Sequence, residues 1–198
     1  MRLLIFTRYP EDGRVKTRLI PALGAAGAKR LHRRMTEDTV SKLKGTANIE
    51  VCYDGGDEGL MREWLGGEFI YTPQGPGNLG ERLHAAFLRA FRQGEDRVAA
   101  VGTDCPGLEK THMEEAFFLL TRQDLVLGPA ADGGYYLIGL RNMYPEIFTG
   151  IPWGTGEVFR QTKKKAAAME LKTAVLAELT DVDRPEDLAL LPFYQGPP

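Results

Sequence analysis

Short apolar runs alternate with amphipathic helical patterns along this chain, and this alternation limits the possible folds more than any other feature. Strands separated by helices predict a mostly parallel sheet with helices on both faces. The predicted strands cover residues 3–7, 49–53, 68–71, 98–101, 124–128, 135–140 and 173–177. The predicted helices cover residues 24–44, 60–65, 79–91, 112–121, 158–169 and 185–191. We therefore predict an α/β fold of the single-domain, three-layer α/β/α sandwich type.

The bulk composition fits a small enzyme. With 198 residues, of which 43% are hydrophobic, the chain is long enough to bury a sizeable core, and we expect one domain over residues 1–195. The formal charge of −2 gives no general attraction to nucleic acid or to anionic lipid. Cys52 and Cys105 have no C-x-x-C partner, and no apolar run reaches membrane-spanning length. We expect a cytoplasmic protein that binds neither nucleic acid nor membrane.

A carboxylate follows the apolar strand at 98–101. Asp104 lies where open α/β sheets bind ligands, just beyond the carboxyl end of a strand. Mg²⁺ and Mn²⁺ prefer carboxylate oxygens and substrate phosphates, so we predict that Asp104 is both a metal ligand and a catalytic residue. The alternative is a turn or cap residue. Cys105 next to it fits a small buried apolar side chain better than a nucleophile, because no histidine accompanies it in the sequence.

A basic loop follows the first strand, over residues 7–19. Backbone N–H groups near a helix start, together with mobile cations, are how proteins cradle polyphosphates. The loop has neither the P-loop pattern nor the G-x-G-x-x-G pattern, and a solvated basic turn is the alternative. The residues that we predict to bind the phosphate groups of a nucleotide ligand here are Arg8, Gly13, Lys16 and Arg18.

A glycine-rich loop over residues 74–82 precedes the helix at 79–91. Its glycines permit close backbone approach to a flat ligand such as a base, and Asn78 fits a helix cap. The alternative is an ordinary loop between a strand and a helix. We predict that Gly77, Asn78 and Gly80 contact the nucleotide.

The segment 128–140 combines a carboxylate, paired glycines and two tyrosines. Asp132 is the residue that we expect to orient or deprotonate an acceptor, and the alternative is an Asp-Gly hairpin turn. Trp153 offers a second stacking surface downstream, and Thr155 is either a substrate contact or a helix cap. The predicted substrate-binding residues are Gly133, Gly134, Tyr135, Trp153 and Thr155.

Two carboxylates follow the last predicted strand. Asp181 and Asp183 alternate with Val182, so both point to the same side of an extended segment. We predict that Asp183 is the second metal ligand, and capping before Pro185 is the alternative.

Taken together, these segments resemble a known family. V-K-T-R-L, N-L-G-E-R-L, G-T-D-C-P, G-P-A-A-D-G-G-Y-Y-L-I-G-L, I-P-W-G-T and D-V-D-R-P-E-D-L occur in this order. The combination resembles the DUF2064 transferases, a branch of the nucleotide-diphospho-sugar transferases with the GT-A fold, and it spans nearly the whole chain. The resemblance implies a glycosyltransferase-like enzyme. The chain departs from the family at Asn78, where aspartate is common.

We expect metal-assisted transfer from a nucleotide-sugar or nucleoside triphosphate donor to a small-molecule acceptor. Asp104 and Asp183 would hold Mg²⁺ or Mn²⁺, and Lys16 and Arg18 would neutralise phosphate charge. Glycosyl transfer is the leading expectation. The main alternative is nucleotidyl transfer, because the 2-phospholactate guanylyltransferases share a K-T-R-L beginning and a paired-glycine segment. A catalytically inactive nucleotide-binding module is a third, and a homodimer is an open expectation.

Overall fold

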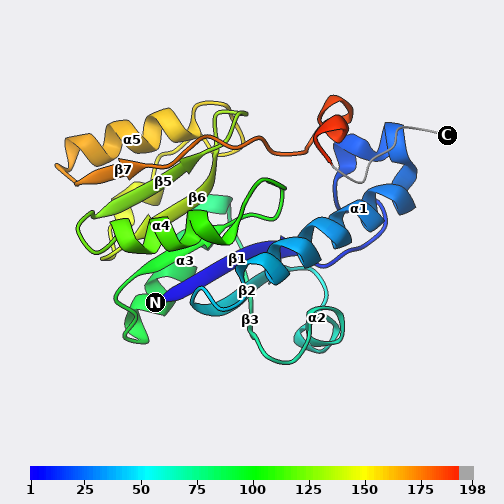
Figure 1. Ribbon diagram of the computed structural model, residues 1–198, viewed down its shortest axis with the longest axis horizontal. Coiled ribbons are helices and arrows are strands. Elements are labelled where there is room, and N and C mark those ends of the chain that lie inside the picture. Colours follow the sequence, from blue (N-terminus) through cyan, green and yellow to red (C-terminus); the bar gives the residue numbers. More distant parts are fainter. Residues whose placement is uncertain (192–198) are drawn as a thin grey trace.

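A seven-stranded sheet in the order β3-β2-β1-β4-β6-β5-β7 forms the centre of the computed structural model, which describes residues 1–191 (Figure 1). The strands are β1 (Arg2–Arg8), β2 (Asn48–Asp54), β3 (Ile70–Pro73), β4 (Val98–Val101), β5 (Leu125–Pro129), β6 (Tyr135–Leu140) and β7 (Thr173–Val175). The α-helices are α1 (Ile20–Leu43), α2 (Glu58–Leu65), α3 (Leu79–Arg92), α4 (Lys110–Leu119) and α5 (Val158–Ala168). Three short 3₁₀ helices are η1 (Thr17–Leu19), η2 (Pro145–Phe148) and η3 (Pro185–Leu190).

The pairing confirms a mostly parallel sheet with one reversed strand. β1 pairs in parallel with β2 and with β4, β2 pairs in parallel with β3, and β5 pairs in parallel with β7. β6 is antiparallel to both of its neighbours, β4 and β5. The β5–β6 connection is a short hairpin, because only antiparallel neighbours can be joined by so few residues. The carboxyl ends of β1 and β4 consequently meet at the same edge of the sheet.

Helices cover both faces of the sheet, as the sequence predicts. Leu3 and Ile5 point to the face covered by α1, α2 and α4, whereas Leu4 between them points to the face covered by α3 and α5. Alternate residues of a strand face opposite sides of a sheet, so the middle of β1, residues 3–6, is apolar on both faces. These two cores, one on each side of the sheet, make the three-layer α/β/α sandwich (Figure 1).

The first helix departs most from its predicted bounds. It begins at Ile20 rather than at 24, but Gly24 has a φ of 69° and interrupts it, so the regular part follows the predicted start. A glycine adopts this backbone conformation at little steric cost. β3 begins at Ile70 rather than 68 and β7 ends at Val175 rather than 177, and the other predicted elements agree within two residues.

The C-terminal segment returns across the molecule to the beginning of α1. Val182, Leu188 and Leu191 form a third small apolar cluster with Leu19 and Met35, among others. This cluster brings the segment around Asp181 next to the loop that follows β1. The predicted domain end at residue 195 lies outside the described residues.

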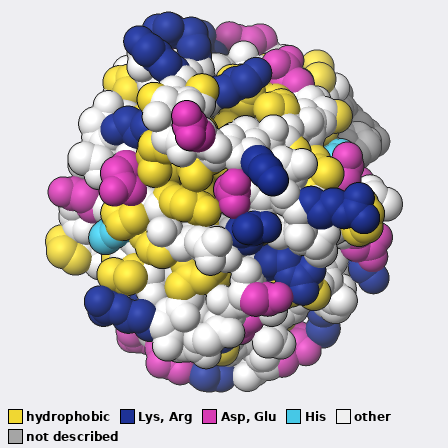
Figure 2. Space-filling view, turned by 90° about the vertical axis from the view of Figure 1, so that its left-hand side faces the viewer, with side chains coloured by type: hydrophobic (Ala, Val, Ile, Leu, Met, Phe, Trp, Pro, Cys, Tyr) yellow, Lys and Arg dark blue, Asp and Glu magenta, His cyan; other side chains and the backbone are white. Residues whose placement is uncertain are grey.

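The molecular surface has no strong bias of charge on the face that Figure 2 presents. Lys and Arg side chains there are intermixed with Asp and Glu side chains, beside an area of hydrophobic side chains. Among the described helices, none combines the length and the apolar character that a membrane crossing requires.

Candidate functional site

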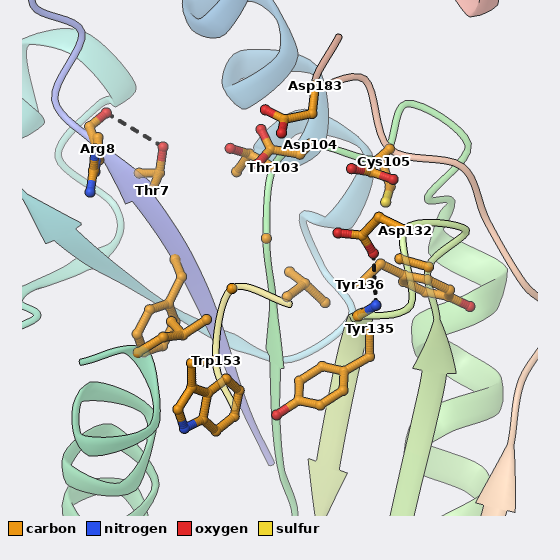
Figure 3. A pocket seen from close by; sticks show the side chains of 18 of the residues that line it. Thr7, Arg8, Thr103, Asp104, Cys105, Asp132, Tyr135, Tyr136, Trp153 and Asp183 are labelled. Carbon is orange, nitrogen blue, oxygen red and sulfur yellow. Dashed lines mark hydrogen bonds between the residues drawn. The ribbon is translucent and has the colours of Figure 1, made fainter. Parts of the chain in front are cut away.

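A cavity of about 760 Å³ opens at the carboxyl ends of β1 and β4, where the sequence places its chemical segments (Figure 3). Side chains reach it from the loop after β1, the loop before α3, the β5–β6 turn and the C-terminal segment. The predicted site residues that line it are Arg8, Lys16, Arg18, Gly77, Asp104, Asp132, Gly134, Tyr135, Trp153, Thr155 and Asp183. Segments far apart in the sequence therefore line one continuous cavity.

Lys16 is the most constrained cation of this site. Its side chain is only 3% exposed, and its Nζ lies 2.6 Å from Asp104 Oδ1. It also donates a hydrogen bond to the carbonyl oxygen of Val182, whose own N–H donates to the carbonyl oxygen of Asp104 at 2.8 Å. The backbone of Lys16 is left-handed, with φ 47° and ψ 43°, a conformation that is uncommon for a residue with a side chain. Lys16 thus joins the end of β4 to the C-terminal segment inside the cavity.

Two further arginines of the basic loop are held by carboxylates at the cavity. Arg18 forms an ion pair with Asp183. Arg8 Nε lies 3.3 Å from Asp54 Oδ2. Arg18 is 66% exposed at its side chain, so it is free to reorganise around an incoming anion, unlike Lys16.

Gln74 and Arg82, which are not among the predicted site residues, shape the glycine-rich loop. The Gln74 side-chain amide donates to the carbonyl oxygens of Thr7 at 3.0 Å and Cys52 at 2.9 Å. Arg82 donates to Gln74 Oε1 at 3.2 Å and to the carbonyl oxygen of Gly77 at 2.9 Å. Because both side chains line the cavity, the loop presents polar groups on a rigid frame.

Asn78 and Gly80 have structural roles in this loop. Asn78 Oδ1 accepts a hydrogen bond from the Glu81 N–H at 3.1 Å, and Glu81 Oε2 accepts one from the Asn78 N–H at 2.7 Å, which is a capping box for α3. A Cβ atom at Gly80 would lie 2.2 Å from Trp153 Nε1, so this glycine lets the indole pack against α3. Neither Asn78 nor Gly80 lines the cavity, and neither do the predicted residues Gly13 and Gly133, within the described residues 1–191.

Asp132 lies in the turn of the β5–β6 hairpin, so the hairpin alternative describes its backbone correctly. Its Oδ1 accepts a hydrogen bond from the Gly134 N–H at 2.7 Å, and Gly133 in the turn has a φ of 86°. The Ala131 N–H donates to the carbonyl oxygen of Leu179 at 3.0 Å, which fixes the turn against the C-terminal segment. Asp132 nevertheless lines the cavity, so a turn position and an acceptor role are compatible.

Four carboxylates gather at one end of the cavity: Asp104, Asp132, Asp181 and Asp183. Burial, followed by the Asp132, Asp183 and Asp104 carboxylates, raises the pKa of Asp181 above its ordinary value. Repulsion of this kind marks a place where an added cation is favourable. Within residues 1–191, no three of the His, Cys, Asp and Glu side chains are close enough to ligate one metal ion on their own.

Buried groups beneath the cavity support the strand ends. The Thr36 hydroxyl of α1 is 3.2 Å from the Thr7 hydroxyl and donates to the Thr103 hydroxyl at 3.3 Å. His32 Nε2 lies 2.9 Å from the carbonyl oxygen of Arg8, and burial lowers the pKa of this imidazole. Burial, followed by the Asp181 and Asp104 carboxylates, raises the pKa of the Cys105 thiol, which fits an inert buried side chain.

The structure also adds residues that sequence reasoning missed. Arg14, His32, Gln74 and Arg82 line the cavity, and so does Asp181, which the sequence places on the same side as Asp183 without a role of its own. Arg14, Gln74 and Arg82 lie inside segments that the sequence singles out, whereas His32 lies on a helix and gives no local signal. The N-cap residue of α5 is Glu157 rather than Thr155, but the Thr155 hydroxyl accepts a hydrogen bond from the Glu157 N–H at 3.3 Å and so supports the helix start.

Comparison with known proteins identifies relatives over most of the chain. The family model DUF2064, described as an uncharacterized protein conserved in bacteria, matches residues 39–155. The 2-phospho-L-lactate guanylyltransferase of Methanocaldococcus jannaschii is 28% identical over 183 residues, which cover 92% of this chain and 78% of that protein.

Solved structures give the same fold. A Desulfovibrio desulfuricans G20 protein, provisionally assigned as a nucleotide-diphospho-sugar transferase, matches with a TM-score of 0.89 and 36% identity over 92% of this chain and 82% of its own. Glucosyl-3-phosphoglycerate synthase of Mycobacterium tuberculosis, in complex with Mn²⁺, UDP and its product, matches with a TM-score of 0.54 and 13% identity over 94% of this chain and 74% of its own. These matches confirm the predicted resemblance, the GT-A type of fold and the general class of transferase.

Proposed function

The chain belongs to the DUF2064 family, and from this membership and the geometry of the cavity we propose that it is a metal-assisted nucleotidyltransferase. It would take a nucleoside triphosphate donor and a small acceptor with a nucleophilic oxygen. The observation that carries the proposal is the buried Lys16, held at the end of β4 within a loop that supplies three further arginines to the same cavity. Nucleotidyl transfer releases pyrophosphate, and several cations in one loop suit this highly charged leaving group.

The cations have separate tasks in this proposal. Lys16, already desolvated, would bind the donor's phosphate oxygens by charge-assisted hydrogen bonds, which gain strength in a buried site. Arg18 would leave Asp183 and follow the outer phosphates, because its side chain is exposed. Gly77, Gln74 and Arg82 would contact the base and ribose from the glycine-rich loop.

The carboxylates fit a divalent cation that is shared with the donor. Mg²⁺ is commonly held by one or two carboxylates together with substrate phosphates and water, rather than by a cage of protein ligands. Asp104 and Asp183 would hold the ion, and the repulsion that raises the pKa of nearby Asp181 supports extra positive charge there. When bound, the ion would supply electrostatic stabilisation of the phosphates.

Asp132 would orient the acceptor oxygen and take its proton if the acceptor is a hydroxyl. One of its oxygens accepts the Gly134 N–H, which leaves the other for the acceptor. The acceptor oxygen bonds to the α-phosphorus, the bond between that phosphorus and the bridging oxygen breaks, and pyrophosphate leaves with the bonding electrons. Tyr135, Trp153 and Thr155 would contact the acceptor from the far wall.

Glycosyl transfer remains the second candidate. It is favoured by the Desulfovibrio desulfuricans relative, whose assigned class covers transferases of sugar nucleotides. In that reaction the acceptor oxygen bonds to the anomeric carbon, and a nucleoside diphosphate leaves instead of pyrophosphate.

Product analysis separates the candidates. The protein is incubated with Mn²⁺, with each nucleoside triphosphate or nucleotide sugar, and with a pool of phosphorylated small molecules. Pyrophosphate release that Asp104→Asn abolishes supports nucleotidyl transfer, and nucleoside diphosphate release supports glycosyl transfer. Nucleotide binding by a thermal shift without either product would instead support the inactive binding module.

A further inference from the structure

The end of the cavity away from the carboxylates is lined by apolar and aromatic side chains. Figure 3 shows Trp153 and Tyr135 beside each other there, while Asp104 and Asp183 lie at the opposite end. We call this part the apolar chamber. Its walls are Phe6, Leu79, Leu83, Tyr135, Ile138 and Trp153.

The walls of the apolar chamber come from both the core and the surface. Leu83 and Ile138 are 4% and 1% exposed and belong to the core between the sheet and α3. Leu79, in the first turn of α3, is 45% exposed although it is a large apolar side chain. Exposed apolar side chains that line a concavity mark a place where an apolar ligand is buried.

Trp153 is fixed as a wall rather than a mobile surface residue. Its ring is perpendicular to that of Tyr135, with the centroids 6.1 Å apart and an interplanar angle of 88°. Its Nε1 approaches Gly80 so closely that a Cβ atom there would lie 2.2 Å away. The two rings thus form a corner that can hold a flat group against one ring face.

The apolar chamber offers few polar partners. The hydroxyls of Tyr135 and of Thr162 on α5 are buried, and neither has a partner within the described chain other than the opposite hydroxyl. A sugar ring placed here would lose water from its hydroxyl groups and gain little in return, which is costly. A hydrocarbon or aromatic group would lose nothing of this kind.

The apolar chamber adjoins the acceptor side of the cavity. Tyr135 follows the Asp132–Gly134 turn directly, and the carbonyl oxygen of Gly133 accepts the Phe159 N–H at 3.0 Å, so the turn is joined to the start of α5. The glycine-rich loop at Gln74 instead presents polar groups, which suit the hydrogen-bonding edge of a base.

We propose that the apolar chamber is an acceptor subsite, and that the acceptor carries an aromatic or aliphatic group next to its nucleophilic oxygen. This assignment rests on the proposed function only in naming the ligand an acceptor. The flat group packs in the corner of Trp153 and Tyr135, and the nucleophilic end points back toward Asp132.

Isothermal titration calorimetry on the full chain tests the proposal with two phosphate monoesters of equal charge. Phenyl phosphate is expected to bind about tenfold or more tightly than glycerol 1-phosphate, because only the former fills the apolar chamber. Trp153→Ala is expected to remove this selectivity, because it should lower the affinity for phenyl phosphate far more than the affinity for glycerol 1-phosphate. Tyr135→Phe is the matched control, since it keeps the ring and should keep the selectivity.

A second variant covers the case in which Trp153→Ala fails to fold. Leu79→Ser changes an exposed side chain and should lower the affinity for phenyl phosphate several-fold. A direct signal is also accessible, because the chain has two tryptophans and Trp64→Phe leaves Trp153 as the fluorescent reporter. Phenyl phosphate should change this fluorescence at concentrations where glycerol 1-phosphate does not.

Two results would overturn the proposal. One is equal affinity of the wild-type protein for the two monoesters. The other is a loss of nucleoside triphosphate affinity in Trp153→Ala that equals its loss of phenyl phosphate affinity, which would place the base in the apolar chamber. Selectivity for the aryl ester in a protein that releases no pyrophosphate would support the apolar chamber as a binding site. That result would refute only the proposal of nucleotidyl transfer.

Discussion

At the scale of single residues, the site depends on charges that are already paired. Lys16 is almost fully enclosed, whereas its partner Asp104 is 54% exposed at its side chain, so only the lysine is desolvated before any ligand arrives. Removing Asp104 would leave the buried Lys16 charge without its carboxylate, which costs more than the pair itself contributes. Substitutions here therefore affect both binding and stability, and their tests need ligands that differ in charge.

Lys16→Met is expected to lower affinity for a nucleoside triphosphate by about tenfold or more. Charge-assisted hydrogen bonds to phosphate contribute about 1.5 to 3 kcal/mol, whereas the uncharged nucleoside makes none to this side chain. Calorimetric titration with both ligands measures the difference. Lys164→Met, on the exposed side of α5, is the control, and equal losses for nucleoside and nucleotide would remove Lys16 from the phosphate site.

Tyr135→Phe combined with Thr162→Val is expected to stabilise the fold by about 1 kcal/mol. The two buried hydroxyls have no partner other than each other, and replacing both by apolar groups removes their desolvation cost. Urea denaturation of the double variant and of each single variant measures the free energy of unfolding. A double variant less stable than the wild type would show that the hydroxyls are satisfied in solution.

At the scale of elements, the packing of the Trp153 segment against α3 decides the shape of the cavity. A Cβ atom at Gly80 would meet Trp153 Nε1 at 2.2 Å and the Phe148 carbonyl oxygen at 2.6 Å, and a backbone oxygen cannot turn aside as a side chain can. The helix start and the loop after η2 are thus matched to a residue with no side chain.

Gly80→Ala is expected to destabilise the protein by about 1 to 3 kcal/mol, as overpacking does, and to shift Trp153. Thermal unfolding and the fluorescence of Trp153 in the Trp64→Phe background measure the two effects. Gly102→Ala is the matched control, because a Cβ atom there meets nothing within 4 Å. Equal stability of the two variants would show that the Trp153 segment gives way freely.

The elements were largely predictable from local patterns, and the site was predictable only in part. Apolar runs such as residues 3–7 must be buried on both faces, which predicts the parallel sheet. The capping box at Asn78 is likewise a local pattern. The burial of Lys16 and the approach of His32 depend on contacts with residues far away in the sequence, and no local pattern reports them.

At the scale of the whole molecule, one titratable group couples the site to global stability. His32 is buried, and burial lowers its pKa below the ordinary value of 6.5, with Lys16 and Arg8 acting in the same direction and Asp104 and the hydrogen bond to Arg8 opposing it. The unfolded chain therefore binds a proton at a higher pH than the folded chain does.

The free energy of unfolding is expected to fall as the pH drops below 6.5 and through the lower pKa of the folded state. His32→Gln should flatten this part of the profile, because glutamine does not titrate. Urea denaturation between pH 5 and 7.5 measures it, with His84→Gln as the control on α3. Identical profiles for wild type and His32→Gln would assign the acid sensitivity to other groups.

The single domain over residues 1–195, the cytoplasmic location and the homodimer stay predictions.

The contact from Lys16 to Val182 spans 166 residues, and this has a consequence for protein synthesis. A growing chain exposes the basic loop first, but the carbonyl that holds Lys16 is synthesised 166 residues later, together with apolar residues that cover η1. The sheet strands β1 to β4 can pair long before that, since all of them precede residue 102. The proposed nucleotide site is therefore completed only after β1 to β4 have been made, so its ligand cannot assist the pairing of these strands.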